Sequence, residues 1–157
     1  MMLSHTSRKH RREGYVNPIP TTDIIIEYEQ DGKEGIVLIT RRNPPYGLAL
    51  PGGFHELGIS SGENARKEAK EETGLDILIE DETKPFAVYS RPDRDPRDHM
   101  ISITYVARGS GELRAGDDAA GARLYSFNEL CSLLGKSNFA FDHEYIIRDY
   151  LKWKDML

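Results

Sequence analysis

Three glutamates near the middle of the chain have a spacing that could bind a metal ion. Glu68, Glu71 and Glu72 stand at positions i, i+3 and i+4, so their side chains would emerge from one face of a helix. Carboxylates this close repel one another, and a hard divalent cation would turn that repulsion into coordination. Such cations often share their oxygen ligands with substrate phosphates, so the pattern favours phosphate chemistry.

The same residues also fit a helix surface held by salt bridges. Glu63 precedes Lys67 by four residues, and Lys67 precedes Glu71 by four, and such pairs are common on solvated helices. The loop just before the helix, PGGF at 51–54, favours metal binding, because a glycine turn can bring a backbone carbonyl beside the ions. The predicted metal ligands are Gly52, Glu68, Glu71 and Glu72, with Mg²⁺ as the expected ion and Mn²⁺ as a substitute.

The helix that carries these acids has recognisable ends. Ser60 is followed three residues later by Glu63, which is the spacing of a capping box. Gly74 stands where a helix often ends in a left-handed glycine. The apolar residues between them are Ala65 and Ala69, four apart and small. We therefore expect a helix that lies close against a sheet but buries little apolar area.

The stretch from Gly53 to Leu75 resembles the Nudix box. The pattern of that family is Gly, five residues, Glu, seven residues, then Arg-Glu-apolar-x-Glu-Glu-x-Gly-apolar. Gly53 opens the match, and the segment 67–75, KEAKEETGL, closes it at the right separation. A motif of this length with correct internal spacing is highly specific. The resemblance implies an α/β protein with the Nudix fold, an α/β/α sandwich around a mixed β-sheet.

Two positions depart from the Nudix pattern. Ile59 stands where the family has its first glutamate, and Lys67 stands where it has arginine. In the family these two residues look like an ion pair that steadies the loop against the helix. Lysine keeps the charge but loses the two-pronged geometry of arginine, and it could pair with Glu63 or Glu71 instead. We infer that Ile59 loosens the site without abolishing it.

The resemblance also implies a reaction, because Nudix proteins typically hydrolyse a nucleoside diphosphate linked to another moiety. A basic group must take the proton of the attacking water, and Glu68 or Glu71 could do so. In many relatives a carboxylate from a later loop serves, which here would come from residues 116–121, GDDAAG. That loop also reads as an ordinary solvated turn. The predicted catalytic residues are Glu68, Glu71, Glu72 and Asp118.

Segments outside the box resemble archaeal and bacterial ADP-ribose pyrophosphatases. They are residues 17–27, 41–54, 95–102 (where relatives usually have glycine in place of Asp98) and 141–143. The likeness covers nearly the whole chain from residue 17. It implies Mg²⁺-dependent hydrolysis of ADP-ribose to AMP and ribose 5-phosphate, by a homodimer that builds its adenine pocket across the interface.

Several residues suit such a ligand. Tyr46 or Phe54 could offer an aromatic face to the adenine, and Arg42 and Arg97 could contact phosphate or stack on a base. Each also has an ordinary structural role open to it, since Phe54 could be core and Arg42 a surface charge. The predicted substrate-binding residues are Arg42, Tyr46, Phe54, Arg97 and His99, of which His99 equally fits a hydrogen-bonding role within its loop.

Two other functions remain open. A nucleotide-binding or sensor protein could keep this fold with weakened catalysis, which Ile59 and Lys67 favour and the three intact glutamates oppose. A Nudix enzyme could also act on another nucleoside diphosphate derivative.

The elements that must position these residues alternate between strands and helices. The expected strands are Thr21–Tyr28, Gly35–Thr40, Leu48–Leu50, Phe86–Tyr89, Met100–Ala107 and Arg123–Ser126. After the glutamate helix, two further helices are expected at Asn128–Leu134 and Asp142–Trp153. The chain thus reads as one mixed α/β domain.

Length and composition fit this reading. The 157 residues, 38% hydrophobic and 30% charged, suit one domain at 17–157 after a basic, flexible tail at 1–16. A net charge of −5 does not favour a nucleic-acid partner. Cys131 is the single cysteine, which suits a reducing compartment. With no membrane-spanning run or secretion signal in the sequence, we expect a cytoplasmic protein without a membrane partner.

Overall fold

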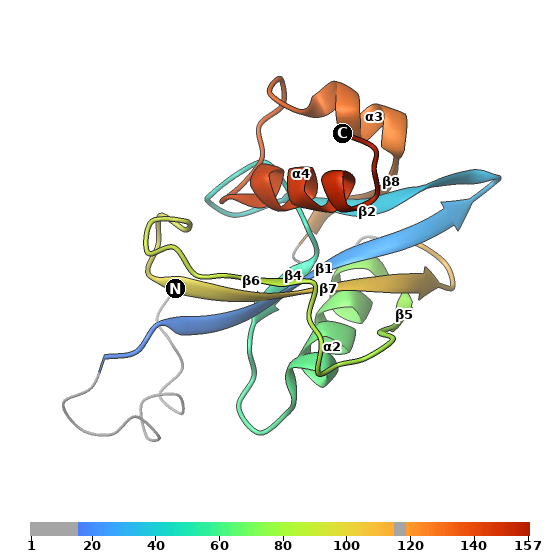
Figure 1. The fold of residues 1–157 in the computed structure, drawn as a ribbon. Helices are drawn as coiled ribbons and strands as arrows, with labels where there is room; N and C mark the ends of the chain where they lie inside the picture. Colours follow the sequence, from blue (N-terminus) through green and yellow to red (C-terminus); the bar gives the residue numbers. More distant parts are fainter. Residues whose placement is uncertain (1–15, 115–118) are drawn as a thin grey trace.

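The computed structural model describes residues 16–114 and 119–157. They form an eight-stranded sheet with helices on both faces (Figure 1). The strands are β1 (Ile19–Gln30), β2 (Lys33–Arg41), β3 (Leu48–Ala49), β4 (Gly52–Phe54), β5 (Asp76–Leu78), β6 (Ala87–Tyr89), β7 (Met100–Ser110) and β8 (Ala119–Ser126). The helices are α2 (Ser61–Thr73), α3 (Phe127–Leu133) and α4 (His143–Trp153). None of these described helices is long and apolar enough to cross a membrane.

Strand β1 lies at the centre of the sheet. It pairs antiparallel with β2 through a tight turn at Asp31 and Gly32, both with positive φ, as a two-residue hairpin turn requires. On its other edge β1 pairs in parallel with β7. The first residues of β1 also pair antiparallel with β4, which sets Asp23 opposite Gly52. The predicted mixed sheet is thus confirmed, with the order β3-β2-β1-β7-β5 along its main path.

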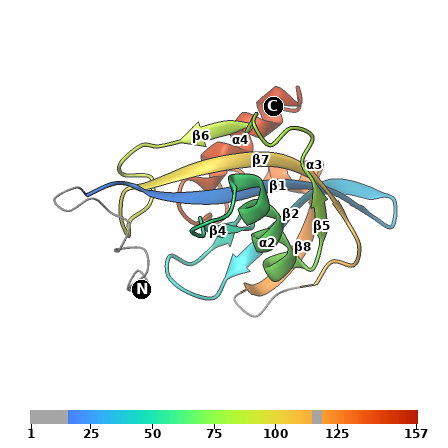
Figure 2. The ribbon, with the colours of Figure 1, turned by 90° about the horizontal axis from the view of Figure 1, so that it is seen from below.

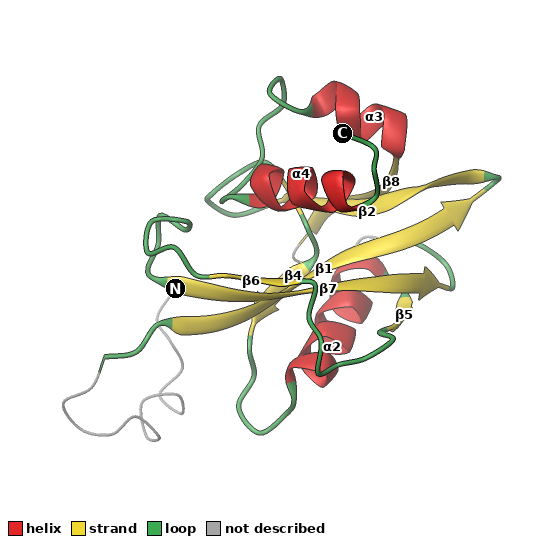
Figure 3. Cartoon of the chain, in the orientation of Figure 1, coloured by secondary structure: helices red, strands yellow, loops and turns green. Residues whose placement is uncertain are grey.

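The two faces of the sheet are covered by different helices, as Figures 2 and 3 show. One cluster of buried side chains joins α2 to the sheet: Ile24, Ile26, Val37, Ala65, Ala69, Leu75, Ile77, Ile79, Tyr105 and Ala107. The other joins α3 and α4 to the opposite face: Ile25, Ile36, Leu38, Leu50, Tyr125, Leu130, Ile146, Ile147, Tyr150 and Leu151. This is the α/β/α sandwich that the resemblance implies.

Helix α2 begins and ends as the sequence predicts. The Ser60 hydroxyl accepts a hydrogen bond from the Glu63 amide, and the Glu63 carboxylate accepts one from the Ser60 amide, completing the capping box. Gly74 ends the helix in the left-handed conformation, with φ of 75°. Ala65 and Ala69 are fully buried. Because both side chains are small, the helix lies close to the sheet.

The other predicted elements are also found, with ends that shift by a few residues. Strands β4 and β5, each of three residues, are absent from the sequence-based assignment. Their short runs carry no usable periodicity of their own, and they exist because β1 and β7 offer free edges to pair with.

Candidate metal and nucleotide site

The turn at β4 holds two of the three glutamates of α2. The Gly52 amide donates a hydrogen bond to Glu72 Oε2 at 2.9 Å. The carboxylate of Glu68 packs against Gly53 so closely that a β-carbon there would lie 2.7 Å from it. Only glycine therefore fits at Gly53 without displacing the acid. The glycine turn and the acidic helix form one unit, as the box spacing indicates.

Asn64 fixes the segment between β4 and α2. Its side chain is fully buried, and its amide nitrogen donates to the Thr22 hydroxyl at 2.7 Å. Its carbonyl oxygen accepts from the Glu56 amide at 2.9 Å. Because Thr22 belongs to the central strand, Asn64 ties the loop and the helix start to the sheet.

Glu71 lies on the outer side of the helix, where it meets Lys67. The Lys67 ammonium is 3.2 Å from Glu71, 3.5 Å from Glu68 and 3.5 Å from Glu56. Although partial burial works against its charge, the carboxylates of Glu68 and Glu71 raise the pKa of Lys67. Of the two partners proposed from the sequence, Glu71 is found in contact, whereas Glu63 is engaged in the capping box. The loop carboxylate that contacts Lys67 comes from Glu56. Position 59, where the Nudix box has a glutamate, is occupied by the half-buried Ile59.

The charges around Glu72 favour a cation. Burial raises the pKa of Glu72 to about 8, and the nearby carboxylates of Glu68 and Asp23 add to the rise, against the Gly52 hydrogen bond and Arg41. A carboxylate with this pKa is crowded by negative charge in a place of low solvation. A divalent cation would relieve that crowding with the oxygen ligands that it prefers.

The carboxylates gathered at this turn are oxygen donors of the kind that a hard divalent cation prefers. Within residues 16–114 and 119–157, no three His, Cys, Asp or Glu side chains already stand together as a metal-binding group. Metal binding by Gly52, Glu68, Glu71 and Glu72 stays a prediction. Asp23 is the acid that the sequence-based assignment missed. Its signal was a lone carboxylate within the apolar run TTDIII.

Beyond Gly53 the strand leads into a stack of aromatic rings and guanidinium groups. The Arg97 guanidinium lies 5.4 Å from the ring centre of Phe54 and 4.9 Å from that of Phe141. The Arg41 guanidinium lies 4.7 Å from the Phe141 ring centre. Burial and the nearby Arg97 charge lower the pKa of Arg41. Two neighbouring guanidinium groups with aromatic faces make a suitable place for an anionic, ring-bearing ligand.

Arg97 is aimed by its own loop. Asp95 is buried, and its carboxylate accepts hydrogen bonds from Arg97 Nε at 3.1 Å, Arg97 Nη2 at 2.9 Å and the Arg97 amide at 2.9 Å. Arg97 is thus held over the rings before any ligand arrives.

The remaining predicted substrate residues are placed differently. Arg42 is exposed, and Tyr46 is 60% exposed. His99 hydrogen-bonds the Ser90 carbonyl at 2.9 Å, the loop role that the sequence left open. The structure thus brings Phe54 and Arg97 together and adds Arg41 and Phe141 to the same stack. Substrate contact by each of the predicted residues stays a prediction. Asp118, with its neighbour Asp117, lies outside the described residues.

Comparison with known proteins identifies the family. A model of the NUDIX domain matches residues 18–150 of the chain. The chain belongs to the Nudix family. The family and the fold predicted from the sequence are both confirmed.

Two curated proteins and one solved structure show what this chain is similar to. An ADP-ribose pyrophosphatase of Methanocaldococcus jannaschii is 46% identical over 144 residues, covering 90% of this chain and 78% of that protein. An ADPR responsive transcriptional repressor of Acinetobacter baylyi is 30% identical over 105 residues, covering 63% of this chain but 40% of the repressor. The NUDIX domain of Shewanella oneidensis NrtR, solved with ADP ribose, superimposes with a TM-score of 0.75 over 98% of this chain and 99% of that domain. At 16% identity, that last likeness shows the fold alone.

Proposed function

We propose that this Nudix protein is an ADP-ribose pyrophosphatase that hydrolyses ADP-ribose to AMP and ribose 5-phosphate, with Mg²⁺ as its metal. The observation that carries the proposal is the 46% identity with the Methanocaldococcus jannaschii ADP-ribose pyrophosphatase, which extends over 90% of this chain. Nudix hydrolases use a divalent metal, and the carboxylates gathered at the β4 turn are the oxygen donors that Mg²⁺ prefers.

The residues of α2 and β4 would hold the metal and orient the reacting groups. We assign Glu68, Glu71 and Glu72 as its side-chain ligands, with the Gly52 backbone beside them, and the Gly52 amide keeps Glu72 turned toward the site. When bound, a divalent metal offsets the charge of the diphosphate and lowers the pKa of an attacking water. Glu68 or Glu71 would accept the proton of that water, because their carboxylates border the same face.

The stack beyond β4 would hold the rest of the substrate. Phe54 offers an aromatic ring next to the Gly52–Gly53 turn, and Arg97, fixed by Asp95, brings a positive charge over that ring. We assign these two as substrate contacts, together with Arg41. Arg42, Tyr46 and His99 remain candidate contacts, and the exposed Tyr46 ring is free to meet a ligand from the solvent side.

A second function, ADP-ribose sensing without efficient hydrolysis, is supported by a specific observation. The chain is 30% identical to an ADPR responsive repressor, and Ile59 and Lys67 depart from the Nudix box. The contact between Glu56 and Lys67 weakens that alternative, because it restores a loop-to-helix ion pair from another position. Hydrolysis of another nucleoside diphosphate derivative is the third outcome that the experiment must separate.

One assay separates these functions. The purified chain is incubated with Mg²⁺ or Mn²⁺ and, in separate reactions, ADP-ribose, nucleoside triphosphates, NADH and diadenosine polyphosphates, and the products are identified by chromatography. We expect AMP and ribose 5-phosphate from ADP-ribose and little product from the other compounds. Tight metal-dependent binding of ADP-ribose without products would favour sensing, and preferential cleavage of another compound would reassign the substrate.

Two further parts of the proposal concern the protein in its cell. We propose that it acts as a homodimer, which sedimentation or light scattering would reveal, and that it resides in the cytoplasm. The single, exposed Cys131 suits a reducing compartment.

A further inference from the structure

We infer that a buried pair of residues, Asp23 and His143, positions the glycine turn that carries the metal site. The inference rests on the proposed function, since it assigns to the pair a role in holding the metal-binding turn. Neither residue touches the substrate stack in the way that Phe54 and Arg97 do, so both would act as positioning residues.

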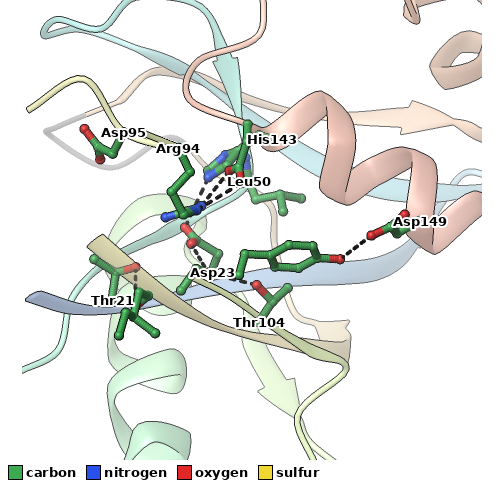
Figure 4. A network of polar contacts seen from close by, with 12 residues as sticks. Thr21, Asp23, Leu50, Arg94, Asp95, Thr104, His143 and Asp149 are labelled. Atoms are coloured by element: carbon green, nitrogen blue, oxygen red, sulfur yellow. Dashed lines mark hydrogen bonds and ion pairs between the residues drawn. The ribbon is translucent and has the colours of Figure 1, made fainter. Parts of the chain in front are cut away.

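His143 reaches the turn from the opposite face of the sheet. It is the first residue of α4 and is 2% exposed. Its Nδ1 accepts a hydrogen bond from the Leu50 amide at 3.0 Å, as Figure 4 shows. Leu50 lies between β3 and β4, two residues before Gly52. The imidazole ring therefore satisfies a buried backbone donor at a point where the chain leaves one strand for the next.

Asp23 meets the same turn from the sheet. One carboxylate oxygen, Oδ1, lies 3.6 Å from His143 Nε2. A β-carbon at Gly52 would clash with this oxygen and with the Thr22 carbonyl oxygen, so no side chain would fit there. The other oxygen, Oδ2, accepts a hydrogen bond from the Ser102 hydroxyl, which also bonds the Thr104 hydroxyl. Asp23 is thus fixed in place by β7 and faces both the histidine and the metal turn.

The hydrogen bonds determine the tautomer of His143. Because Nδ1 accepts from Leu50, the proton of the neutral ring must sit on Nε2, on the side of Asp23. Burial lowers the pKa of His143 in spite of the Asp23 charge, which agrees with a neutral ring. With the proton on Nε2, the ring accepts from the Leu50 amide through Nδ1 and presents an N–H to the Asp23 carboxylate.

Three elements therefore hold three successive residues of the turn. His143 of α4 holds the Leu50 amide, the Ile24 amide of β1 donates to the Pro51 carbonyl at 2.9 Å, and Glu72 of α2 accepts from the Gly52 amide. Removing the contact between His143 and Leu50 would allow the turn to move, and with it the Gly52 amide that binds Glu72. We expect the ligand geometry around Glu72 to loosen as a result.

The start of α4 is itself bound to residues 90–99, the loop that also carries Arg97. Asp142 stands at the N-cap position but makes no capping hydrogen bond. Its carboxylate binds the buried Arg94 guanidinium through two hydrogen bonds, at 3.0 and 2.6 Å. These contacts fix the position of the helix start from which His143 reaches the turn; Figure 4 shows Arg94 beside His143.

An ordinary buried histidine would stabilise the fold without affecting the metal in particular, so the test must separate stability from positioning. His143→Leu removes both polar contacts of the ring, and His143→Asn keeps an acceptor near the position of Nδ1. Tyr150→Phe is the matched control. Tyr150 lies on the same helix as His143 but away from the turn, and the change removes its partly buried 2.6 Å hydrogen bond to Glu27 of β1. For each, the melting temperature, the Mn²⁺ dissociation constant and the kcat and KM for ADP-ribose are measured.

We expect His143→Leu to weaken Mn²⁺ binding by about 10- to 100-fold, the range typical of residues that orient metal ligands. His143→Asn should recover most of that loss, and Tyr150→Phe should lower the melting temperature while leaving the Mn²⁺ dissociation constant unchanged. Wild-type Mn²⁺ affinity in a folded His143→Leu protein would overturn the inference. Equal weakening in Tyr150→Phe would overturn it too, since the effect would then follow from lost stability.

Two measurements keep the test decisive if the leucine variant does not fold. The first is Ser102→Ala, which frees Asp23 and should also weaken Mn²⁺ binding, whereas unchanged binding would count against the pair. The second is the imidazole nitrogen spectrum of the metal-free wild type, which should show the proton of His143 on Nε2; a proton on Nδ1 would contradict the geometry. If the wild type binds no Mn²⁺ and cleaves no ADP-ribose while the tautomer is as expected, it is the proposed function that fails.

Discussion

The two helical layers of this protein bury very different side chains. Helix α2 presents only small apolar groups to the sheet, Ala65 and Ala69, while α4 buries Ile146, Ile147 and Leu151. The α2 layer gains little from burial but brings carboxylates within contact of the Gly52–Gly53 turn. Helix α4 buries larger apolar side chains than α2 does, and burial of apolar surface is the dominant favourable contribution to folding. The candidate metal ligands thus lie on the helix that buries the smaller apolar side chains.

Single carboxylates show the same contrast. Glu72, in the α2 layer, has its pKa raised because burial and neighbouring acids disfavour its charge. Glu129, in α3 on the opposite face, has its pKa lowered to about 2, chiefly by Lys33 and the Ser126 amide. One acid is short of positive partners and the other has several. Such a difference marks Glu72 as a functional candidate and Glu129 as a structural one.

The largest expected effect is loss of activity from the α2 layer. Replacing Glu72 with glutamine should lower kcat/KM for ADP-ribose by at least about 100-fold, since even residues that only orient metal ligands cost up to that much. The melting temperature of the metal-free protein should not fall, because the variant removes a charge that the site disfavours. Glu63→Gln is the matched control on the same helix, where glutamine still completes a capping box. Comparable loss in both variants would remove the special role of Glu72.

The next effect is loss of stability from the α4 layer. Ile147→Ala should reduce the free energy of unfolding by about 2–5 kcal/mol, because Ile147 is fully buried and the surrounding core cannot close the cavity completely. Mn²⁺ affinity of the remaining folded protein should match that of the wild type. Denaturant unfolding and metal titration measure the two quantities. A marked loss of Mn²⁺ affinity in Ile147→Ala would contradict the claim that this core position affects stability without affecting the metal site.

A smaller effect is expected at the ion pair between loop and helix. Glu56→Gln should reduce kcat/KM by a few-fold, because the pair with Lys67 is partly exposed and such pairs contribute about 0–1 kcal/mol. Adding Ile59→Glu to that variant should restore the rate, since it returns a carboxylate to the position that the Nudix box reserves for one. Ile59→Glu alone should raise turnover only slightly, because Glu56 already meets Lys67. No recovery in the double variant would show that Glu56 is not a substitute.

The smallest effect concerns pH. The folded-state pKa of Glu129 lies below its ordinary value of 4.5, so its ionised form adds stability above that pH and the gain is lost as pH falls toward 2. The difference in melting temperature between the wild type and Glu129→Gln should therefore narrow between pH 4.5 and pH 2. Thermal unfolding across that range measures it. A constant difference would mean that the Lys33 and Ser126 contacts do not favour the charged form.

Features encoded locally could be predicted from the sequence. The capping box and left-handed glycine of α2 depend on residues a few positions apart. The resemblance to the Nudix box implies that the acids lie beside the glycine turn, where Glu68 and Glu72 are found. The main strands follow from their apolar, β-branched runs. These local signals were sufficient for the fold and for two of the acids that face the turn.

Features that depend on distant parts of the chain could not be predicted in the same way. The contact of His143 with Leu50 joins residues 93 positions apart. The stack of Arg41, Phe141 and Arg97 joins the end of β2 to two separate loops. Phe141 adopts a positive φ. This conformation is uncommon for a bulky residue, and nothing in the sequence around Phe141 indicates it. In the sequence Asp23 is a single acid within a largely apolar strand. Its place beside the glycine turn follows only from the pairing of β1 with β4, which sets it opposite Gly52.

The most direct test of the central claim is a crystal structure with Mn²⁺ and an uncleavable ADP-ribose analogue, in which the anomalous signal locates the metal. The account expects metal between the Gly52–Gly53 turn and the carboxylates of α2, with the diphosphate bound to it and the Arg97 stack beside the nucleotide. A metal or a diphosphate bound elsewhere, with Glu68 and Glu72 uncoordinated, would contradict it.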